Sequence, residues 1–298
     1  MTSQSLTVAV LGLGNMGGPM AANLVRAGHE VRGFDPVRAA QEAARATGVS
    51  LCDTPAEAVR GSSVVLTMLP NGALVHSTYD AVLPEAEPGT LFIDSSTISV
   101  DDARAVHATA VKAGMRQVDA PVSGGVKGAT AGSLAFMVGG EDEAFAAAGP
   151  VLEPMAGKVI HCGGPGAGQA AKVCNNMVLA VHQIVIGEAF VLAERLGLEH
   201  QALFDVVTGA TGNSWALHTN CPVPGPVPTS PANHDFTPGF ATALMNKDLG
   251  LALAALESTG TVAPLGAAAA ALYDEFAQDN GGKDFSAIIT SIRDSSRG

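Results

Sequence analysis

A glycine-rich turn near the N-terminus most constrains the fold of this chain. The apolar run Leu6–Leu11 leads directly into Gly12-Leu13-Gly14-Asn15-Met16-Gly17, and a segment with helical periodicity follows. In such a strand–turn–helix unit the first glycine permits the tight turn, the second lets the backbone approach a pyrophosphate, and the third lets the helix pack against the sheet. Unpaired N–H groups at the helix start attract phosphate. We therefore expect residues 12–17 to bind a dinucleotide.

The residue after the second predicted strand indicates which dinucleotide binds. Asp35 follows the run Glu30–Phe34. A carboxylate at this place accepts hydrogen bonds from the adenosine ribose hydroxyls and repels a 2′-phosphate. Arg38 is near enough in sequence to receive such a phosphate, but we interpret it as a solvated helix residue. The sequence thus favours NAD over NADP.

Short apolar runs alternate with Ala-rich helical segments up to about residue 164. Strands that alternate with helices predict an α/β fold with a mainly parallel, doubly wound sheet, and near-continuous apolar strands indicate that both faces are covered. This pattern predicts a Rossmann-type NAD-binding domain over residues 1–164. The predicted strands are residues 6–11, 30–34, 63–68, 90–93, 115–118, 134–138 and 158–161.

The pattern becomes helical after residue 164. Residues 168–196 keep helical spacing without an internal proline, and a helix of that length would span roughly 42 Å. The remainder is rich in Ala and Leu and has no convincing strand. It is interrupted by a proline-rich loop, Cys221–Pro231, which suits neither helix nor sheet. We expect residues 165–298 to form a linking helix and an all-helical domain.

Charge and composition exclude several partner classes. A formal net charge of −12 repels nucleic-acid phosphates and anionic membranes. The four cysteines and the histidines are scattered without metal-ligand spacing, which predicts free thiols in a reducing compartment and no metal site. Polar residues interrupt the most apolar stretch, Met177–Leu192, and the start, Met1–Ser5, lacks a signal-peptide pattern. We expect a cytoplasmic protein with no nucleic-acid or membrane partner.

Three polar segments are candidates for chemistry. Asp119–Gly125 follows a predicted strand at its carboxyl end, where open α/β sheets bind ligands, although taken alone an ordinary Pro-Gly loop explains it better. Lys172 and Asn176 lie four residues apart, and therefore project from one helix face. Small apolar neighbours would dehydrate this lysine and lower its pKa toward the range useful for proton transfer, whereas a surface lysine is the alternative. For Lys247-Asp248, spacing does not show whether the pair reaches a cleft.

Stretches along nearly the whole chain resemble the β-hydroxyacid dehydrogenases, and most closely their 3-hydroxyisobutyrate branch. In the N-terminal half the matching stretches are GLGNMGGPMAANL from Gly12, DSSTI from Asp94 and DAPVSGGVKGATAGSLAFMVGG from Asp119. In the C-terminal half they are GAGQAAKVCNNMVLA from Gly166, NSWAL from Asn213, FTPGF from Phe236 and LMNKDLGLA from Leu244, together with the proline-rich loop. These stretches follow the order they have in the family.

The resemblance implies a role for each matching residue. Lys172 would be the general acid/base that takes the hydroxyl proton as hydride leaves for the nicotinamide, and Asn176 would orient the substrate. Trp215 would form an apolar wall near the substrate methyl group, or simply pack within the helical domain. The remaining implied contacts are Ser123, Gly124 and Gly125 to the substrate carboxylate, Leu69, Pro70 and Thr97 to the cofactor, and Lys247 and Asp248 closing over both.

The implied activity is NAD-dependent oxidation of 3-hydroxyisobutyrate to methylmalonate semialdehyde in valine breakdown, by a homodimer or homotetramer. A tartronate semialdehyde reductase of the same family is the nearest alternative, since it shares the turn, the Ser-Gly-Gly loop and the lysine. The NSWAL stretch and the proline-rich loop favour the hydroxyisobutyrate branch. A non-catalytic NAD-binding module is a third reading, which the intact lysine and asparagine disfavour.

Overall fold

The chain folds into two compact units, one ending at Lys172 and the other beginning at Val173. The structure is a computed structural model that describes residues 5–296. The segment Met1–Ser5, for which the sequence predicts no signal peptide, therefore lies mostly outside the described residues. Each unit is described by itself below.

The first unit is built on a nine-stranded sheet, counted over the described residues. Its order is β3-β2-β1-β4-β5-β6-β8-β7, and β9 pairs with β8. Strands β1 to β6 are parallel, and β8 is antiparallel to β6 and β7. The predicted doubly wound, mainly parallel α/β fold is confirmed. The bounds are β1 Thr7–Leu11, β2 Glu30–Phe34, β3 Ser50–Leu51, β4 Val64–Thr67, β5 Leu91–Asp94, β6 Arg116–Asp119, β7 Val122–Ser123, β8 Leu134–Gly139 and β9 Ala156–Gly163.

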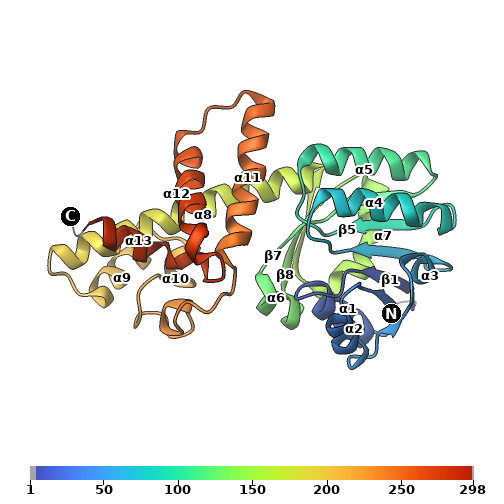
Figure 1. The fold of residues 1–298 in the computed structure, drawn as a ribbon, viewed down its shortest axis with the longest axis horizontal. Coiled ribbons are helices and arrows are strands. Elements are labelled where there is room, and N and C mark those ends of the chain that lie inside the picture. The colour runs from blue at the N-terminus through green and yellow to red at the C-terminus, as the bar shows by residue number, and fades with distance from the viewer. Residues whose placement is uncertain (1–4, 297–298) are drawn as a thin grey trace. The chain divides into compact units, whose positions relative to one another are not determined.

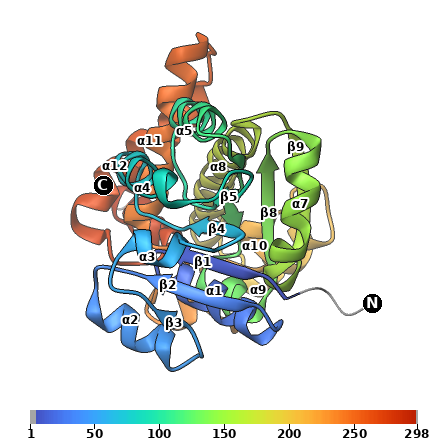
Figure 2. The same cartoon turned by 90° about the vertical axis from the view of Figure 1, so that its right-hand side faces the viewer.

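Helices cover both faces of this sheet because its central strands are apolar on both sides. In β1, Val8 and Val10 pack with Leu24 of α1 in one core, whereas Ala9 and Leu11 belong to a second core with α4 and α5. Figure 2 shows α1 and α2 on one side of the sheet and α4 and α5 on the other. The helices are α1 Gly17–Arg26, α2 Arg38–Arg45, α3 Pro55–Val59, α4 Gly72–Val82, α5 Val100–Lys112, α6 Gly125–Ala131 and α7 Asp142–Leu152.

Two strands were not expected from the sequence. Strands β3 and β7 have two residues each, too few to show alternation. The segment expected to be a loop includes Val122–Ser123, which pairs with Ala135 and Phe136 of β8. The expected loop is therefore partly a strand, and it enters the sheet antiparallel to its neighbour.

The second unit is helical. Helix α8, Ala167–Arg195, begins in the first unit and continues into the second. Figure 1 shows α11 and α12 side by side as an antiparallel pair. Within the described part of this unit, strand-like pairing is limited to one bridge between Ala241 and Asp284. The other helices are α9 His200–Thr208, α10 Trp215–His218, α11 Thr242–Thr259, α12 Pro264–Asn280 and α13 Ile288–Ser295.

A buried carboxylate joins separate segments of the second unit. Asp284 accepts hydrogen bonds from the Gly239 and Phe240 amides, from Asn220 Nδ2, and from both the amide and the hydroxyl of Ser286. Only 1% of its surface is exposed. This one side chain fixes the loop before α11 and the segment after α10, where little regular structure is present.

Helix α8 is apolar and long enough to cross a membrane by length and composition alone. Its most apolar window has a mean hydropathy of 1.6, and half of that window is buried within the protein. Core helices of globular proteins pass the same test, so the helix is weak evidence for a membrane span.

Candidate active site

The glycine-rich turn lies between β1 and α1, and each of its glycines meets a different environment. Gly12 has a φ of +97°, and a Cβ there would overlap the Met68 carbonyl oxygen. A Cβ at Gly17 would overlap the Gly12 carbonyl oxygen. Gly14 has neither constraint: its φ is ordinary, and no protein atom lies within 4 Å of where its Cβ would be. The protein's own packing thus explains Gly12 and Gly17, and leaves an open cradle at Gly14.

Asp35 lies at the carboxyl end of β2, beside this turn. Its Oδ2 accepts a hydrogen bond from the Leu13 amide at 2.8 Å, and its Oδ1 accepts one from the Val37 amide at 2.8 Å. The residue is 8% exposed. Each carboxylate oxygen has a second lone pair, so these bonds leave room for further donors. Arg38 pairs with Glu42 on the surface, as a solvated helix residue does.

The loops after β4 and β5 are joined at the same sheet edge. The Leu69 amide donates to Ser96 Oγ at 2.8 Å, so Leu69-Pro70 lies against the loop that carries Thr97. The two strands are parallel neighbours, and their carboxyl ends therefore meet. These three predicted cofactor contacts are held together in the first unit.

The N-terminus of helix α8 lies next to the end of β6 in space. The Asp119 carboxylate accepts hydrogen bonds from the Gly166 amide at 2.7 Å and from the Gln169 amide at 2.8 Å. A carboxylate at a helix N-terminus satisfies amides that lack an intrahelical partner and interacts favourably with the helix dipole. Burial nevertheless raises the pKa of Asp119 above its usual value. Lys172, in the next turn of α8, is 6% exposed, and so it is not a surface lysine.

Asn176 begins a polar cluster in the second unit. Its Nδ2 donates to Asp248 Oδ2 at 2.6 Å, and its Oδ1 accepts from Asn175 at 2.9 Å. Asp248 Oδ1 lies 3.9 Å from Lys247 Nζ. Asn176 and Asp248 are buried, and burial also lowers the pKa of Lys247. The Lys247-Asp248 pair, which spacing alone could not place, is therefore joined to Asn176 through Asp248.

The other predicted substrate contacts are placed separately. Ser123 is half-buried in β7, and Gly124 and Gly125 follow with φ values of +130° and +60°, which favour glycine. Trp215, at the start of α10, is 48% exposed. Its ring is therefore not buried by packing within the second unit.

Asp94 was not selected from the sequence as a site residue, although it ends β5 next to the Ser96–Thr97 loop. Its Oδ1 accepts from Thr67 Oγ1 at 2.7 Å and from the Ser96 amide at 3.1 Å. Its Oδ2 is buried, with no hydrogen-bond partner among the described residues. Burial raises the pKa of this carboxyl from 3.8 to about 6. A polar residue at the end of an apolar strand was the available signal.

Asp94→Asn is expected to change how stability depends on pH. Between pH 4 and about 6 the native wild type keeps a proton that the unfolded chain releases, so its stability falls as pH rises through this interval. A rise in pKa from 3.8 to about 6 corresponds to about 3 kcal/mol. The asparagine variant should lack this fall and be more stable than wild type at pH 7. Thermal unfolding from pH 4 to 8 measures it, with exposed Asp80→Asn as the baseline; parallel curves for wild type and Asp94→Asn would contradict the assignment.

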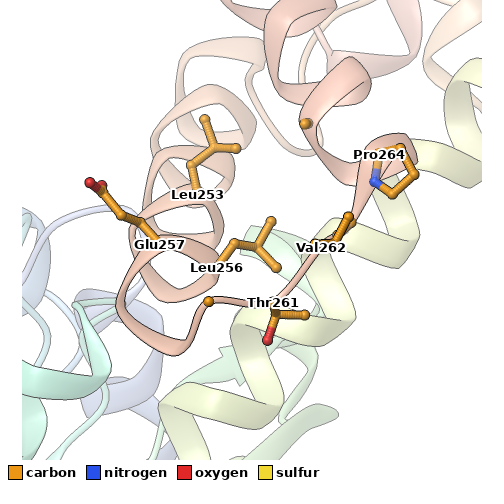
Figure 3. A pocket seen from close by; sticks show the side chains of 9 residues that line it. Leu253, Leu256, Glu257, Thr261, Val262 and Pro264 are labelled. Atoms are coloured by element: carbon orange, nitrogen blue, oxygen red, sulfur yellow. The ribbon is translucent and has the colours of Figure 1, made fainter.

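The second unit also has a surface hollow. Figure 3 shows it at the turn between α11 and α12, lined mainly by Leu253, Leu256, Val262 and Pro264. None of the predicted site residues lines it. Among residues 5–296, no group of three or more His, Cys, Asp or Glu side chains could hold a metal ion.

Comparison with known proteins identifies the family. The sequence model for the NAD-binding domain of 6-phosphogluconate dehydrogenase matches residues 7–164, and the one described as NAD-binding of NADP-dependent 3-hydroxyisobutyrate dehydrogenase matches residues 166–292. A probable 3-hydroxyisobutyrate dehydrogenase from Mycobacterium tuberculosis is 67% identical over 287 residues, which cover 96% of this chain and 98% of the relative. The chain belongs to the 3-hydroxyisobutyrate dehydrogenase family. As a family member it is an NAD-binding oxidoreductase, as the resemblance implied.

One solved structure and one further relative carry L-serine in their names. A solved structure of the M. tuberculosis 3-hydroxyisobutyrate dehydrogenase with L-serine superposes with a TM-score of 0.95 at 66% identity, covering 97% of this chain and all of that one. An NAD-dependent L-serine dehydrogenase from Pseudomonas aeruginosa is 44% identical, covering 89% of this chain and 90% of the relative. The fold is therefore that of the family over nearly the whole chain.

Proposed function

We propose that this protein oxidises 3-hydroxyisobutyrate to methylmalonate semialdehyde with NAD, as a step of valine breakdown. The observation that carries the proposal is the buried Lys172, one helical turn before the buried Asn176, in a chain of this family with an intact dinucleotide turn. A lysine enclosed in this way beside an amide is a suitable group to exchange a proton with a substrate hydroxyl. The same pair makes a non-catalytic NAD-binding module the weaker interpretation.

The open space at Gly14 fits a bound pyrophosphate. No protein atom occupies the place of a Cβ there, so the absence of a side chain leaves that place open to a ligand. The nicotinamide supplies a hydride acceptor when it is bound. Lys172 Nζ takes the proton of the substrate hydroxyl as the hydride leaves the same carbon, so that a carbonyl forms. Asn176, held by Asp248, orients the hydroxyl. Ser123 and the amides at Gly124 and Gly125 bind the carboxylate.

We further propose that NAD is preferred over NADP. Asp35 is fixed by two amides, and its remaining lone pairs suit two ribose hydroxyls. A 2′-phosphate at this place would be repelled by the buried Asp35 carboxylate. The two backbone hydrogen bonds to that carboxylate hold it in position, so it would not rotate away from the phosphate. Among the residues that follow, Arg38 is already paired with Glu42.

L-Serine is a second candidate substrate. The P. aeruginosa relative is named for its oxidation, and the M. tuberculosis relative was solved with it. Both acids place a primary alcohol on the carbon next to the one that bears the carboxylate, so Lys172 and the Ser-Gly-Gly segment would act in the same way on each. They differ in the group on the middle carbon, where a methyl group is exchanged for an ammonium group.

A panel of small hydroxyacids tests the proposal. Steady-state oxidation of 3-hydroxyisobutyrate, L-serine and D-glycerate should give the highest kcat/KM with 3-hydroxyisobutyrate, since one methyl group in an apolar pocket is worth about tenfold or more. With that substrate, NAD should exceed NADP by at least about tenfold in kcat/KM. Preference for L-serine would move the assignment to the second candidate, and preference for D-glycerate would move it to the tartronate semialdehyde branch. Equal use of NADP would contradict the role of Asp35.

We also propose a homo-oligomer. Val178, Val185 and Leu192 recur every seven residues along α8, so they share one helix face, and each is about half exposed. Such an apolar stripe is usually covered in the native assembly. We propose that a second copy of the chain covers this stripe. Sedimentation as a monomer at micromolar concentration would contradict the proposed oligomer. The expected cytoplasmic location stays a prediction.

A further inference from the structure

We propose that Gln169 is a positioning residue for the reaction: it couples the loop that carries Thr97 to the helix turn that carries Lys172. The inference rests on the proposed function for its kinetic consequence, but the coupling itself is a property of the first unit. A single glutamine at the start of an Ala-rich helix belongs to no sequence motif that would mark it as functional.

The side chain of Gln169 joins α8 to the loop after β5. It is 0% exposed. Its Nε2 donates to the Ser96 carbonyl oxygen at 2.7 Å, and its Oε1 accepts from the Ile98 amide at 3.3 Å. These two backbone groups flank Thr97, so the amide holds the loop on both sides of the residue expected to meet the nicotinamide.

The main chain of Gln169 is fixed as well. Its amide donates to Asp119 Oδ2 at 2.8 Å, and Asp119 also accepts from the Gly166 amide. Lys172 is three residues further along the helix, on the same side as Gln169. Gln169 therefore links three segments: the end of β6, the loop after β5, and the first turns of α8.

The primary amide satisfies both backbone groups at once, because it carries a donor and an acceptor side by side. A hydrocarbon side chain would leave the Ser96 carbonyl and the Ile98 amide buried without partners. The loop would then shift to find other partners, and the distance between Thr97 and Lys172 would no longer be fixed. Proton and hydride transfer tolerate such displacements poorly, since a misplacement of about 1 Å can cost about a hundredfold in rate.

Gln169→Leu tests this coupling, with Gln183→Leu as the matched control. Gln183 lies on the same helix, is 0% exposed, and bonds to Asn220 in the second unit. Both variants should lose stability to a similar degree. Only Gln169→Leu should lower kcat, by about tenfold to a hundredfold, with Kd for NAD within about threefold of wild type. Its deuterium isotope effect on kcat, measured with substrate deuterated at the hydroxyl-bearing carbon, should also rise as hydride transfer becomes rate-limiting.

Gln169→Glu provides a second test that keeps the shape of the side chain. An ionised glutamate presents an oxygen to the Ser96 carbonyl and cannot donate to it, whereas a protonated one can. The ratio of kcat for this variant to that of wild type should therefore increase as pH falls, and the ratio for Gln183→Glu should not increase in parallel. A ratio independent of pH would overturn the assignment, even if the leucine variant fails to fold.

Amide hydrogen exchange separates this inference from the proposed function. Gln169→Leu should speed exchange in a peptide containing Ile98 by at least about tenfold, and Gln183→Leu should leave it unchanged. This result does not depend on which hydroxyacid is oxidised, so a failed substrate assignment would leave it intact. Unchanged exchange at Ile98, or a kcat for Gln169→Leu equal to that of Gln183→Leu, would overturn the coupling.

Discussion

Lys172→Ala should lower kcat for hydroxyacid oxidation by about a thousandfold, while Kd for NAD stays within about threefold of wild type. The alanine removes the group that accepts the hydroxyl proton and leaves the glycine-rich turn and Asp35 untouched. Because Lys172 is buried, its loss also creates a space in which a small primary amine could act as the missing base. Stopped-flow and steady-state kinetics measure kcat, and titration of protein fluorescence measures Kd.

Two comparisons make the Lys172→Ala result specific. Lys112→Ala, at the exposed end of α5, removes the same charge from the same unit and should leave kcat within about twofold. Added methylamine should restore part of the activity of Lys172→Ala and none of the activity lost by Asn176→Ala. A Lys172→Ala protein that keeps more than about a tenth of the wild-type kcat would remove this lysine from the mechanism.

Gly14→Ala is expected to abolish tight NAD binding without changing stability. The added methyl group meets no protein atom within 4 Å, and the backbone φ suits alanine, so the fold has no reason to resist the change. A pyrophosphate in van der Waals contact with the turn would have to move away. We expect Kd for NAD to rise by about a hundredfold or more and Tm to shift by less than about 2 °C.

Other glycines provide the controls for Gly14→Ala. Gly282→Ala is also exposed, has an ordinary φ and open space for its Cβ, and should change neither Kd nor Tm. Gly12→Ala should instead lower Tm strongly, because its Cβ meets the Met68 carbonyl and its φ is +97°. Calorimetry of binding and of unfolding gives both quantities. Unaltered NAD affinity in Gly14→Ala would mean that the dinucleotide does not contact this turn.

Local patterns predicted the strands of four or more residues well. The strand Glu30–Phe34 was predicted with its observed bounds, and most other predicted strands deviate by one or two residues at an end. Helix α1 begins at Gly17, the last glycine of the turn, so the turn leads into the helix without an intervening loop. The short strand β7 was missed, since two residues carry no period and their pairing with β8 depends on a distant segment.

The sequence predicted candidate site residues, but it did not predict the hydrogen bonds between them. Motif resemblance selected Lys172, Asn176 and the Lys247-Asp248 pair, but only the fold shows that Asp248 bonds to Asn176 across 72 residues of sequence. Asp94 and Gln169 were not predicted, because their roles follow from burial and from hydrogen-bond partners. Composition and spacing show neither burial nor partners. The predicted contacts of these residues with substrate and cofactor stay predictions.

The continuity of α8 fixes the spacing of two residues that are proposed to act in catalysis. The boundary between the two compact units falls at Lys172–Val173, inside this helix, so the proposed proton acceptor and Asn176 belong to different units. They are nonetheless four residues apart on one helix, and their rise along its axis is fixed at about 6 Å by the helix itself. The spacing of the two groups proposed to act on the substrate hydroxyl is therefore set by α8 alone.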